Sequence, residues 1–233
     1  MLDARGHVYP STLGDVSLTG VTVDGQELSG EHNIGDAPCR MQTVTLHPAH
    51  VQAHPAALNQ IRAAEFIVLG PGSLFTSIIP NLLVPGVLES IRKAKAREEN
   101  PAKTVFVCSL ADMQGETWGM NCYDYVEALM RHGMEGLLDY VLIHKDHGGE
   151  PGVTGFFPVV RDYSDSRYQT RGRRSGQVRR VECNEELIAK IEALGVKTIV
   201  RDMVDLERPT WHDQRELAAA FREVMDECHI QER

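Results

Sequence analysis

An uncharged stretch of 23 residues, positions 66–88, restricts the possible folds of this chain more than any other feature. A run of that length is long enough to cross a bilayer as a single helix. Prolines and glycines interrupt it, and they would break such a helix and leave backbone groups without partners in lipid. The interruptions are Gly70, Pro71, Gly72, Pro80, Pro85 and Gly86. The stretch therefore predicts a buried strand, a tight turn and a helix, and no membrane span.

The turn within this stretch has the chemistry of a ligand-binding loop. Residues 66–69 form a short apolar strand, residues 70–73 carry no bulky side chains, and Ser73 is placed to cap a helix starting at Leu74. In an open α/β sheet, ligands bind beyond the carboxyl ends of the strands, where glycines and a helix N-terminus favour phosphate. We therefore expect free backbone N–H groups to point outward here, although most Gly-Pro-Gly turns only reverse the chain.

Composition excludes several classes of protein. The length of 233 residues suits one domain, and no linker divides it. A net charge of −9 argues against non-specific binding to nucleic acid, which needs an excess of Lys and Arg. The cysteines are odd in number and form no Cys-x-x-Cys pair, so neither a disulfide framework nor a zinc ribbon is predicted. The N-terminus has no apolar signal core, and a reducing cytoplasm is the expected location.

Strands and helices alternate from Phe66 onward, which predicts an α/β fold with a mostly parallel sheet covered by helices on both faces. Further strands are expected at residues 104–110, 139–143 and 197–200, and a polar loop at 111–119. Helices are expected from Pro85 with a Glu89–Lys93 pair, from about 121 to 132, after a cap at Asn184, and after Thr210 and Asp213.

The first 47 residues differ from the rest, because apolar and polar residues alternate there around turns. They predict a β-hairpin with a turn at Asp24 and Gly25, and residues 40–46 as a neighbouring strand. An antiparallel region of this size cannot form a hydrophobic core alone. Residues 1–47 are therefore expected to pack against the α/β region at 48–233 within one domain.

Three histidines, His47, His50 and His54, have a spacing that suits metal binding. Pro48 and Pro55 place them in a loop entering a helix, and no cysteine or carboxylate lies nearby in the sequence. A solvated loop is the favoured interpretation, so no metal site is predicted.

A group of arginines could bind phosphates or an anionic surface. Its members are Arg167, Arg171, Arg173, Arg174, Arg179 and Arg180. The glycines and serines around them favour a solvated, mobile crossover loop instead.

Gly115, Glu116 and Thr117 place a carboxylate and a hydroxyl after the strand expected at 104–110. They would then share a sheet edge with the turn at 70–73, and an exposed polar loop is the alternative. Asp112 is open to the same two interpretations. Trp118 is expected to be a packing residue, or else a cover for a ligand base.

A series of motifs covers nearly the whole chain. The most specific is Gly70-Pro71-Gly72-Ser73-Leu74, followed by Thr76-Ser77 and Pro80-Asn81-Leu82-Leu83-Val84-Pro85-Gly86. Others, in the same order along the chain, are Arg5-Gly6, Pro10-Ser11, Asp24-Gly25, Gly30-Glu31, Gly115-Glu116-Thr117, Glu127-Ala128-Leu129 with His132, and Leu194-Gly195-Val196. In these motifs the sequence resembles the YvcK/CofD-like family, the bacterial gluconeogenesis factors.

The resemblance implies a cytoplasmic protein with a Rossmann-like site for a UDP-sugar such as UDP-N-acetylglucosamine. It also implies links to cell shape, peptidoglycan precursor supply and growth on gluconeogenic carbon sources, with no assigned reaction and no certain cofactor. The ligand-binding residues on this match are Gly70, Pro71, Gly72, Ser73, Leu74, Ser77, Asn81, Glu116 and Thr117.

The chain also departs from the family's pattern. Family members open with a Gly-Gly-Gly-Thr-Gly loop and carry Asp-Asp-Gly-Gly and Asn-Gly-x-Ser-x-Gly segments, none of which is present. Met1 is therefore expected to align with an interior position of the family members, so that the chain would be an incomplete domain. A misassigned start codon or a fragmentary sequence would each explain this. Ser109, Asp112-Met113 and Trp211-His212-Asp213 also differ, and the last change puts a phosphate contact from that corner in doubt.

Three functional hypotheses remain. The first is a nucleotide-sugar-binding regulator that acts by binding. The second is a CofD-like 2-phospho-L-lactate transferase, in which carboxylates hold Mg²⁺ during transfer to a deazaflavin. The third is an inactive fragment that self-associates as a homo-oligomer through an uncovered sheet.

Overall fold

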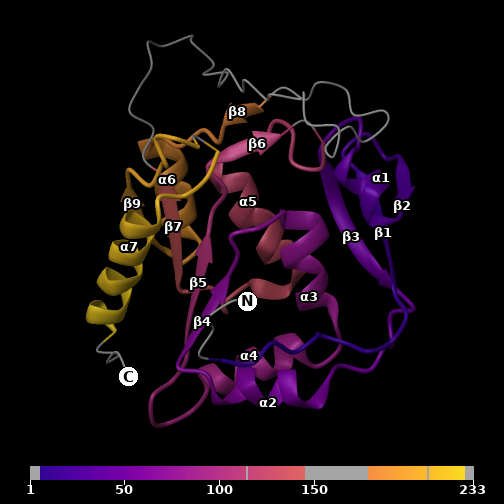
Figure 1. Cartoon of the computed structure of the whole chain (residues 1–233), viewed down its shortest axis with the longest axis horizontal. Coiled ribbons are helices and arrows are strands. Elements are labelled where there is room, and N and C mark those ends of the chain that lie inside the picture. The colour runs from indigo at the N-terminus through magenta and orange to yellow at the C-terminus, as the bar shows by residue number, and fades with distance from the viewer. Residues whose placement is uncertain (1–5, 114, 145–177, 209, 229–233) are drawn as a thin grey trace.

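The computed structural model describes residues 6–113, 115–144, 178–208 and 210–228. Its centre is a parallel sheet whose strands follow one another in chain order (Figure 1). The strands are β4 (Phe66–Leu69), β5 (Lys103–Val107), β7 (Tyr140–His144) and β9 (Lys197–Arg201). Every neighbouring pair is parallel, so the predicted α/β fold is confirmed.

Helices cover both faces of this sheet, as the sequence predicts. One face, with Phe106 and Val141, packs against α4 (Val87–Lys95), α5 (Cys122–Leu129) and α6 (Glu185–Ala193). The opposite face, with Val105 and Leu142, packs against α7 (Gln214–Glu227). Neighbouring strand residues belong to different faces because successive side chains of a strand point to opposite sides of the sheet.

The first strands form a separate antiparallel sheet in the order β2-β1-β3. These strands are β1 (Ser17–Thr22), β2 (Glu27–Ser29) and β3 (Met41–His47). Along the chain, the helix α1 (Glu31–Gly35) connects β2 to β3. The hairpin turn contains Gly25 at φ 85°, a conformation that glycine adopts readily. Leu18, Val44 and Leu46 belong to the same core as one face of the parallel sheet.

One prediction for the middle of the chain is wrong. The polar loop expected at 111–119 begins with a strand, β6 (Ala111–Met113), which pairs antiparallel with β8 (Val178–Arg180). The pairing joins segments far apart in the sequence, and a three-residue strand leaves little local pattern to detect.

The uncharged stretch folds as its composition suggests. After β4 come the turn and two short helical segments, η1 (Leu74–Ile78), a turn of π-helix, and α3 (Ile79–Leu83). No single helix of the described residues is both long and apolar enough to cross a membrane. Two consecutive helices, Leu74–Leu83 and Val87–Lys95, are together long and apolar enough to do so, but the chain bends by 74° between them.

Two details at these helix starts differ from prediction. Ser73 occupies the cap position of η1 but makes no side-chain capping bond. Pro85 is not the first residue of α4, because that helix begins at Val87 after Gly86 at φ 93°. The Glu89–Lys93 pair is present, with 3.6 Å between Oε1 and Nζ.

The remaining helices begin close to their predicted starts. Asn184 accepts from Leu187 N–H at 3.0 Å and caps α6. Asp213 caps α7 by accepting from the amides of Arg215 and Glu216. At α5, the cap Asn121 and Asp124 form a reciprocal capping box that the sequence analysis missed. The helix α2 (Pro55–Ala63) follows the histidine loop.

Candidate functional site

The turn at residues 70–73 lies at the carboxyl end of β4, beside the end of β5. Gly70 has φ +83°, and a Cβ there would approach the Val107 carbonyl oxygen to 3.2 Å. Only glycine fits such a position without strain. Pro71, Gly72 and Ser73 are exposed, so the turn presents its backbone to solvent at the edge where open α/β sheets bind ligands.

A row of exposed polar groups continues from this turn along η1 and α3. Ser73, Ser77 and Asn81 are all exposed. Asn81 Nδ2 donates to the Ser77 carbonyl at 2.7 Å, and Ser11 Oγ donates to Asn81 Oδ1. Leu74 is 1% exposed and packs in the core, so its side chain cannot reach a ligand at this surface. Five of the predicted ligand-binding residues therefore lie on one surface: Pro71, Gly72, Ser73, Ser77 and Asn81.

Glu116 lies behind this surface and is 7% exposed. Its Oε1 accepts from the Phe75 N–H at 3.2 Å, and its backbone carbonyl accepts from Met41 N–H at 2.7 Å. Burial raises the pKa of the Glu116 carboxyl to about 7, although hydrogen bonds from Thr76 and from first-turn amides of η1 lower it. The sequence predicted outward-pointing amides at this turn and helix start, but the amide of Phe75, in the first helical turn, bonds to an internal carboxylate.

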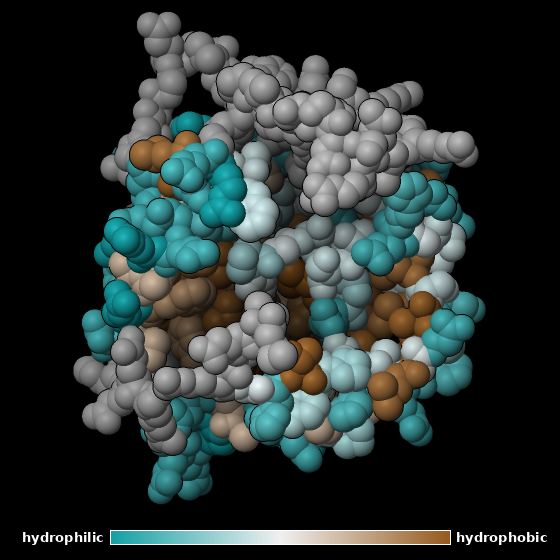
Figure 2. All heavy atoms as spheres, viewed as in Figure 1, coloured by the Kyte–Doolittle hydropathy of each residue, from teal (hydrophilic) through white to brown (hydrophobic). Residues whose placement is uncertain are grey.

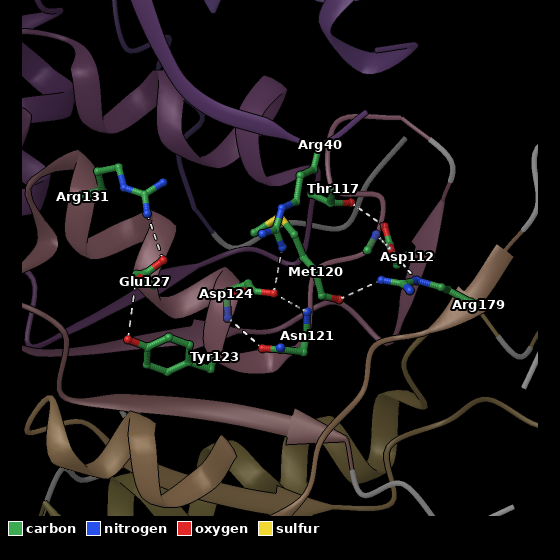
Figure 3. Close-up of polar contacts among 11 residues, drawn as sticks. Arg40, Asp112, Thr117, Met120, Asn121, Tyr123, Asp124, Glu127, Arg131 and Arg179 are labelled. Atoms are coloured by element: carbon green, nitrogen blue, oxygen red, sulfur yellow. Dashed lines mark hydrogen bonds and ion pairs between the residues drawn. The ribbon is translucent and has the colours of Figure 1, made fainter. Parts of the chain in front are cut away.

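Thr117 belongs to a buried network around Asp112 (Figure 3). Thr117 Oγ1 donates to Asp112 Oδ1 at 2.8 Å, while Gly119 N–H and Arg179 Nε donate to Oδ2 at 2.7 and 2.8 Å. Burial raises the pKa of Asp112, and these donors lower it. The Arg179 guanidinium also lies 5.1 Å from the centre of the Trp118 ring, so Trp118 packs against this network.

Residues 115–117 contact four elements of the fold. Gly115 has φ +143°, and a Cβ there would lie only 2.1 Å from the Gly35 carbonyl oxygen in α1. Through Glu116 the segment contacts β3 and η1, and through Thr117 it contacts β6. The structure therefore links Glu116 to the turn at 70–73 through Phe75, while both predicted side chains stay buried.

Only two of the six arginines in the predicted basic group, Arg179 and Arg180, lie in the part of the chain that the structure describes. Arg179 is ion-paired with buried Asp112, at 2.8 Å from Nε to Oδ2. Arg180 also lies in β8. Arg167, Arg171, Arg173 and Arg174 lie outside the described residues. For Arg179, then, the structure shows an internal partner in place of an external phosphate.

The three histidines of the first loop separate in the fold. His47 ends β3, His50 is exposed, and His54 precedes α2 and stacks on Tyr9 with ring centres 5.8 Å apart. Among the described residues, no group of three or more His, Cys, Asp or Glu side chains is arranged to hold a metal ion.

Two histidines outside the predicted set of ligand-binding residues lie at the carboxyl edge of the sheet; of the two, the sequence analysis named only His212, as a departure from the family pattern. His212 Nε2 donates to the Cys108 carbonyl at 3.2 Å, just beyond β5. His144 ends β7, and its Nδ1 accepts from Met203 N–H at 3.1 Å. Burial lowers the pKa of His212, and the nearby His144 lowers it further. The position of His144 directly after a predicted strand is the signal that could have identified it.

Comparison with known proteins places these features in a family. Residues 1–202 match the family described as 2-phospho-L-lactate transferase CofD. The gluconeogenesis factor of Halalkalibacterium halodurans is 38% identical over 151 residues, which cover 65% of this chain and 44% of that protein. The gluconeogenesis factor of Bacillus subtilis is 38% identical over 146 residues, covering 63% and 44%. The chain therefore spans less than half the length of these curated relatives.

A solved structure agrees with the sequence matches. The crystal structure of protein BH3568 from Bacillus halodurans superposes with a TM-score of 0.72 at 32% identity, over 95% of this chain and 63% of that one. Because the family match covers most of the sequence, the chain belongs to the 2-phospho-L-lactate transferase CofD family, with gluconeogenesis factors among its relatives.

Proposed function

We propose that this protein is a gluconeogenesis factor-like regulator that binds a nucleotide-linked sugar of the UDP-N-acetylglucosamine type in the cytoplasm. Binding would connect it to cell shape, peptidoglycan precursor supply and growth on gluconeogenic carbon sources. The names of its relatives support the regulatory role. The observation that carries the ligand proposal is the exposed turn at the carboxyl end of β4, which continues into the polar row of Ser73, Ser77 and Asn81.

The turn suits the diphosphate of such a ligand. Gly72 and Ser73 are exposed and carry no large side chains, so an anion could approach their backbone, and amides at the start of a helix attract anions. The Ser77 and Asn81 side chains lie further along the same face, where hydroxyl groups of a sugar would find donors and acceptors.

Calorimetric titration of UDP-N-acetylglucosamine tests this proposal, with GDP as the control nucleotide and the Bacillus subtilis relative as a comparison. The decisive variant is Gly72→Val, because a Cβ at Gly72 has only ordinary contacts, at 3.7 Å or more, and would narrow the turn without unfolding it. Gly6→Val is the matched control, since nothing lies within 4 Å of a Cβ there. The proposal predicts binding that Gly72→Val weakens at least tenfold; equal affinities in the two variants would refute it.

The family description favours a second candidate, a CofD-like transfer of a phospholactyl group to a deazaflavin with Mg²⁺. The Asp112 carboxylate is fully buried and already accepts from Thr117, Gly119 and Arg179, and no group of three or more potential ligands is arranged to hold a metal among the described residues. The described residues therefore fit this metal poorly, and no step is assigned to it. Magnesium-dependent turnover with a deazaflavin acceptor would favour the transferase over the regulator.

Self-association is a third candidate, favoured by the open edge of the sheet. Within the described residues β4 pairs with β5 alone. Glu65 C=O accepts from Lys103 N–H at 2.9 Å, so by alternation the backbone groups of Phe66 and Val68 point away from β5. Val68 is 40% exposed. Hydrophobic residues gather in a hollow beside α7 (Figure 2). An uncharged edge strand of this kind can pair with the same strand of a second copy.

A further inference from the structure

The two oxygens of the buried Glu116 carboxyl have different surroundings. Oε1 accepts from the Phe75 N–H at 3.2 Å. Oε2 is buried and makes no hydrogen bond to the described residues, although the Thr76 hydroxyl nearby helps to lower the pKa of the carboxyl. A buried carboxyl oxygen without a donor is unfavourable when the group is ionised, and favourable when that oxygen carries a proton.

The bond to Phe75 links this carboxyl to the candidate ligand turn. Phe75 is the second residue of the helical segment Leu74–Leu83, which starts directly after Ser73. Ser73 makes no side-chain capping bond, so the Glu116 carboxyl takes over the role of accepting a first-turn amide. An ionised carboxylate and a bound anion would therefore compete for the same positive end of one helix.

Charged and titratable groups surround Glu116 on several elements. From η2 (Met130–Met134), His132 packs edge-on against Phe75 with ring centres 6.0 Å apart, and burial lowers its pKa, which keeps it neutral. From α5, burial raises the pKa of the Tyr125 hydroxyl, and the charges of Asp112 and Glu116 add to that rise. Among the described residues near the segment 115–117, Asp112 pairs with Arg179 and Asp124 with Arg40, while Asp36 Oδ2 lies 3.6 Å from His32 Nε2.

We infer that Glu116 is a proton-linked positioning residue for the turn at 70–73, keeping Oε1 on the Phe75 amide while Oε2 takes up a proton when an anion binds at the turn. The inference rests on the proposed anionic ligand. The proton comes from the buffer, converts the carboxylate to a neutral carboxyl, and removes the repulsion between Glu116 and the ligand. The bond to Phe75 survives, because a neutral carboxyl still accepts through its carbonyl oxygen.

The acidity of the group fits this role. Because burial raises the Glu116 pKa to about 7, the carboxyl is mostly ionised at pH 8 and mostly neutral at pH 6. A neighbouring anion raises a carboxyl pKa further, so proton uptake on binding is largest just above the pKa of the free protein. Ligand affinity should therefore fall as pH rises above 7, approaching tenfold per pH unit if one proton is taken up.

Calorimetry of UDP-N-acetylglucosamine binding at pH 7.5, in Hepes and in Tris, measures this proton uptake directly. These buffers have different ionisation enthalpies, so the difference between the two heats gives the number of protons bound. The wild-type protein should take up a fraction of a proton per ligand, and Glu116→Gln should take up none and bind with an affinity that is flat from pH 6 to 8.5. Glu89→Gln, an exposed glutamate on α4, is the matched control and should behave as the wild type.

The outcomes separate this inference from the proposed function. Binding without proton uptake in the wild type, or with equal uptake in Glu116→Gln, would overturn the inference and leave the ligand proposal intact. Absence of binding in every variant would sink the proposed function and the linkage with it. A ligand-free measurement adds a second check: the NMR shift of the Phe75 amide should titrate with a midpoint near pH 7, and should not do so in Glu116→Gln.

Discussion

His132 Nε2 accepts a hydrogen bond from the backbone N–H of Val44 at 3.1 Å, joining the antiparallel sheet to the helix that ends beside it. The other ring nitrogen, Nδ1, donates to the Ala128 carbonyl at 2.7 Å, so the imidazole is neutral with its proton on Nδ1. Arg131 donates to the neighbouring Gln42 carbonyl at 3.1 Å. Side chains from η2 thus occupy the outer edge of β3, which would otherwise present unpaired backbone groups.

His132→Leu is expected to destabilise the protein by roughly 1–3 kcal/mol, because it leaves the buried Val44 N–H without an acceptor. Burial lowers the folded-state pKa of His132 below its usual 6.5, so its stabilising contribution is present above pH 6.5 and is lost as pH falls through the folded pKa. Urea unfolding at pH 7.5 and 5.5 measures both effects. The exposed His32→Leu is the control, and an equal acid dependence in His132→Leu and wild type would contradict this role.

Glu116→Gln should stabilise the free protein at pH 8. The folded-state pKa of about 7 lies above the usual 4.5, so the contribution of Glu116 to stability is fully present below pH 4.5 and is lost as pH rises to 7. A shift of that size corresponds to about 3 kcal/mol as an upper value. Chemical denaturation across this range checks it: the gap between variant and wild type should widen with pH, whereas a constant gap would show that Glu116 is ionised normally.

Arg179→Met should destabilise the protein by roughly 3–5 kcal/mol, because it leaves the fully buried Asp112 without its charged partner. The double variant Asp112→Asn with Arg179→Met should recover part of that loss, since no buried charge remains. Thermal or urea unfolding of the two single variants and the double variant measures the coupling. Additive losses would mean that the pair contributes nothing beyond its separate side chains.

Val68→Lys tests whether the open edge of β4 pairs with a second copy. A charge on an edge strand opposes strand pairing, so the variant should be monomeric at concentrations where the wild type self-associates. Light scattering after size exclusion gives the masses. Leu206→Lys, at a residue that is 88% exposed, is the control, and a monomeric wild type would rule out the edge as a self-association surface.

Some features of this protein follow from the sequence alone, because neighbouring residues produce them. The strand Phe66–Leu69 and the caps at Asn184 and Asp213 are local: an apolar run sets the first, and a side chain bonding amides two or three residues away sets the others. The parallel sheet could also be predicted from the sequence, because its strands are neighbours in space in the same order in which they follow one another along the chain.

The candidate site depended on contacts between distant residues. Local chemistry and the order of the strands selected the turn and Glu116, and the family motifs supported both. None of these signals fixes exposure, so they could not show that the turn is open to solvent while Glu116 is buried against Phe75, 41 positions earlier. Arg179 belonged to an arginine group that predicted an exposed loop, and its ion pair with Asp112 spans 67 positions. Burial, pKa and the partners of a charge depend on which elements pack around it, so only the tertiary structure decided them.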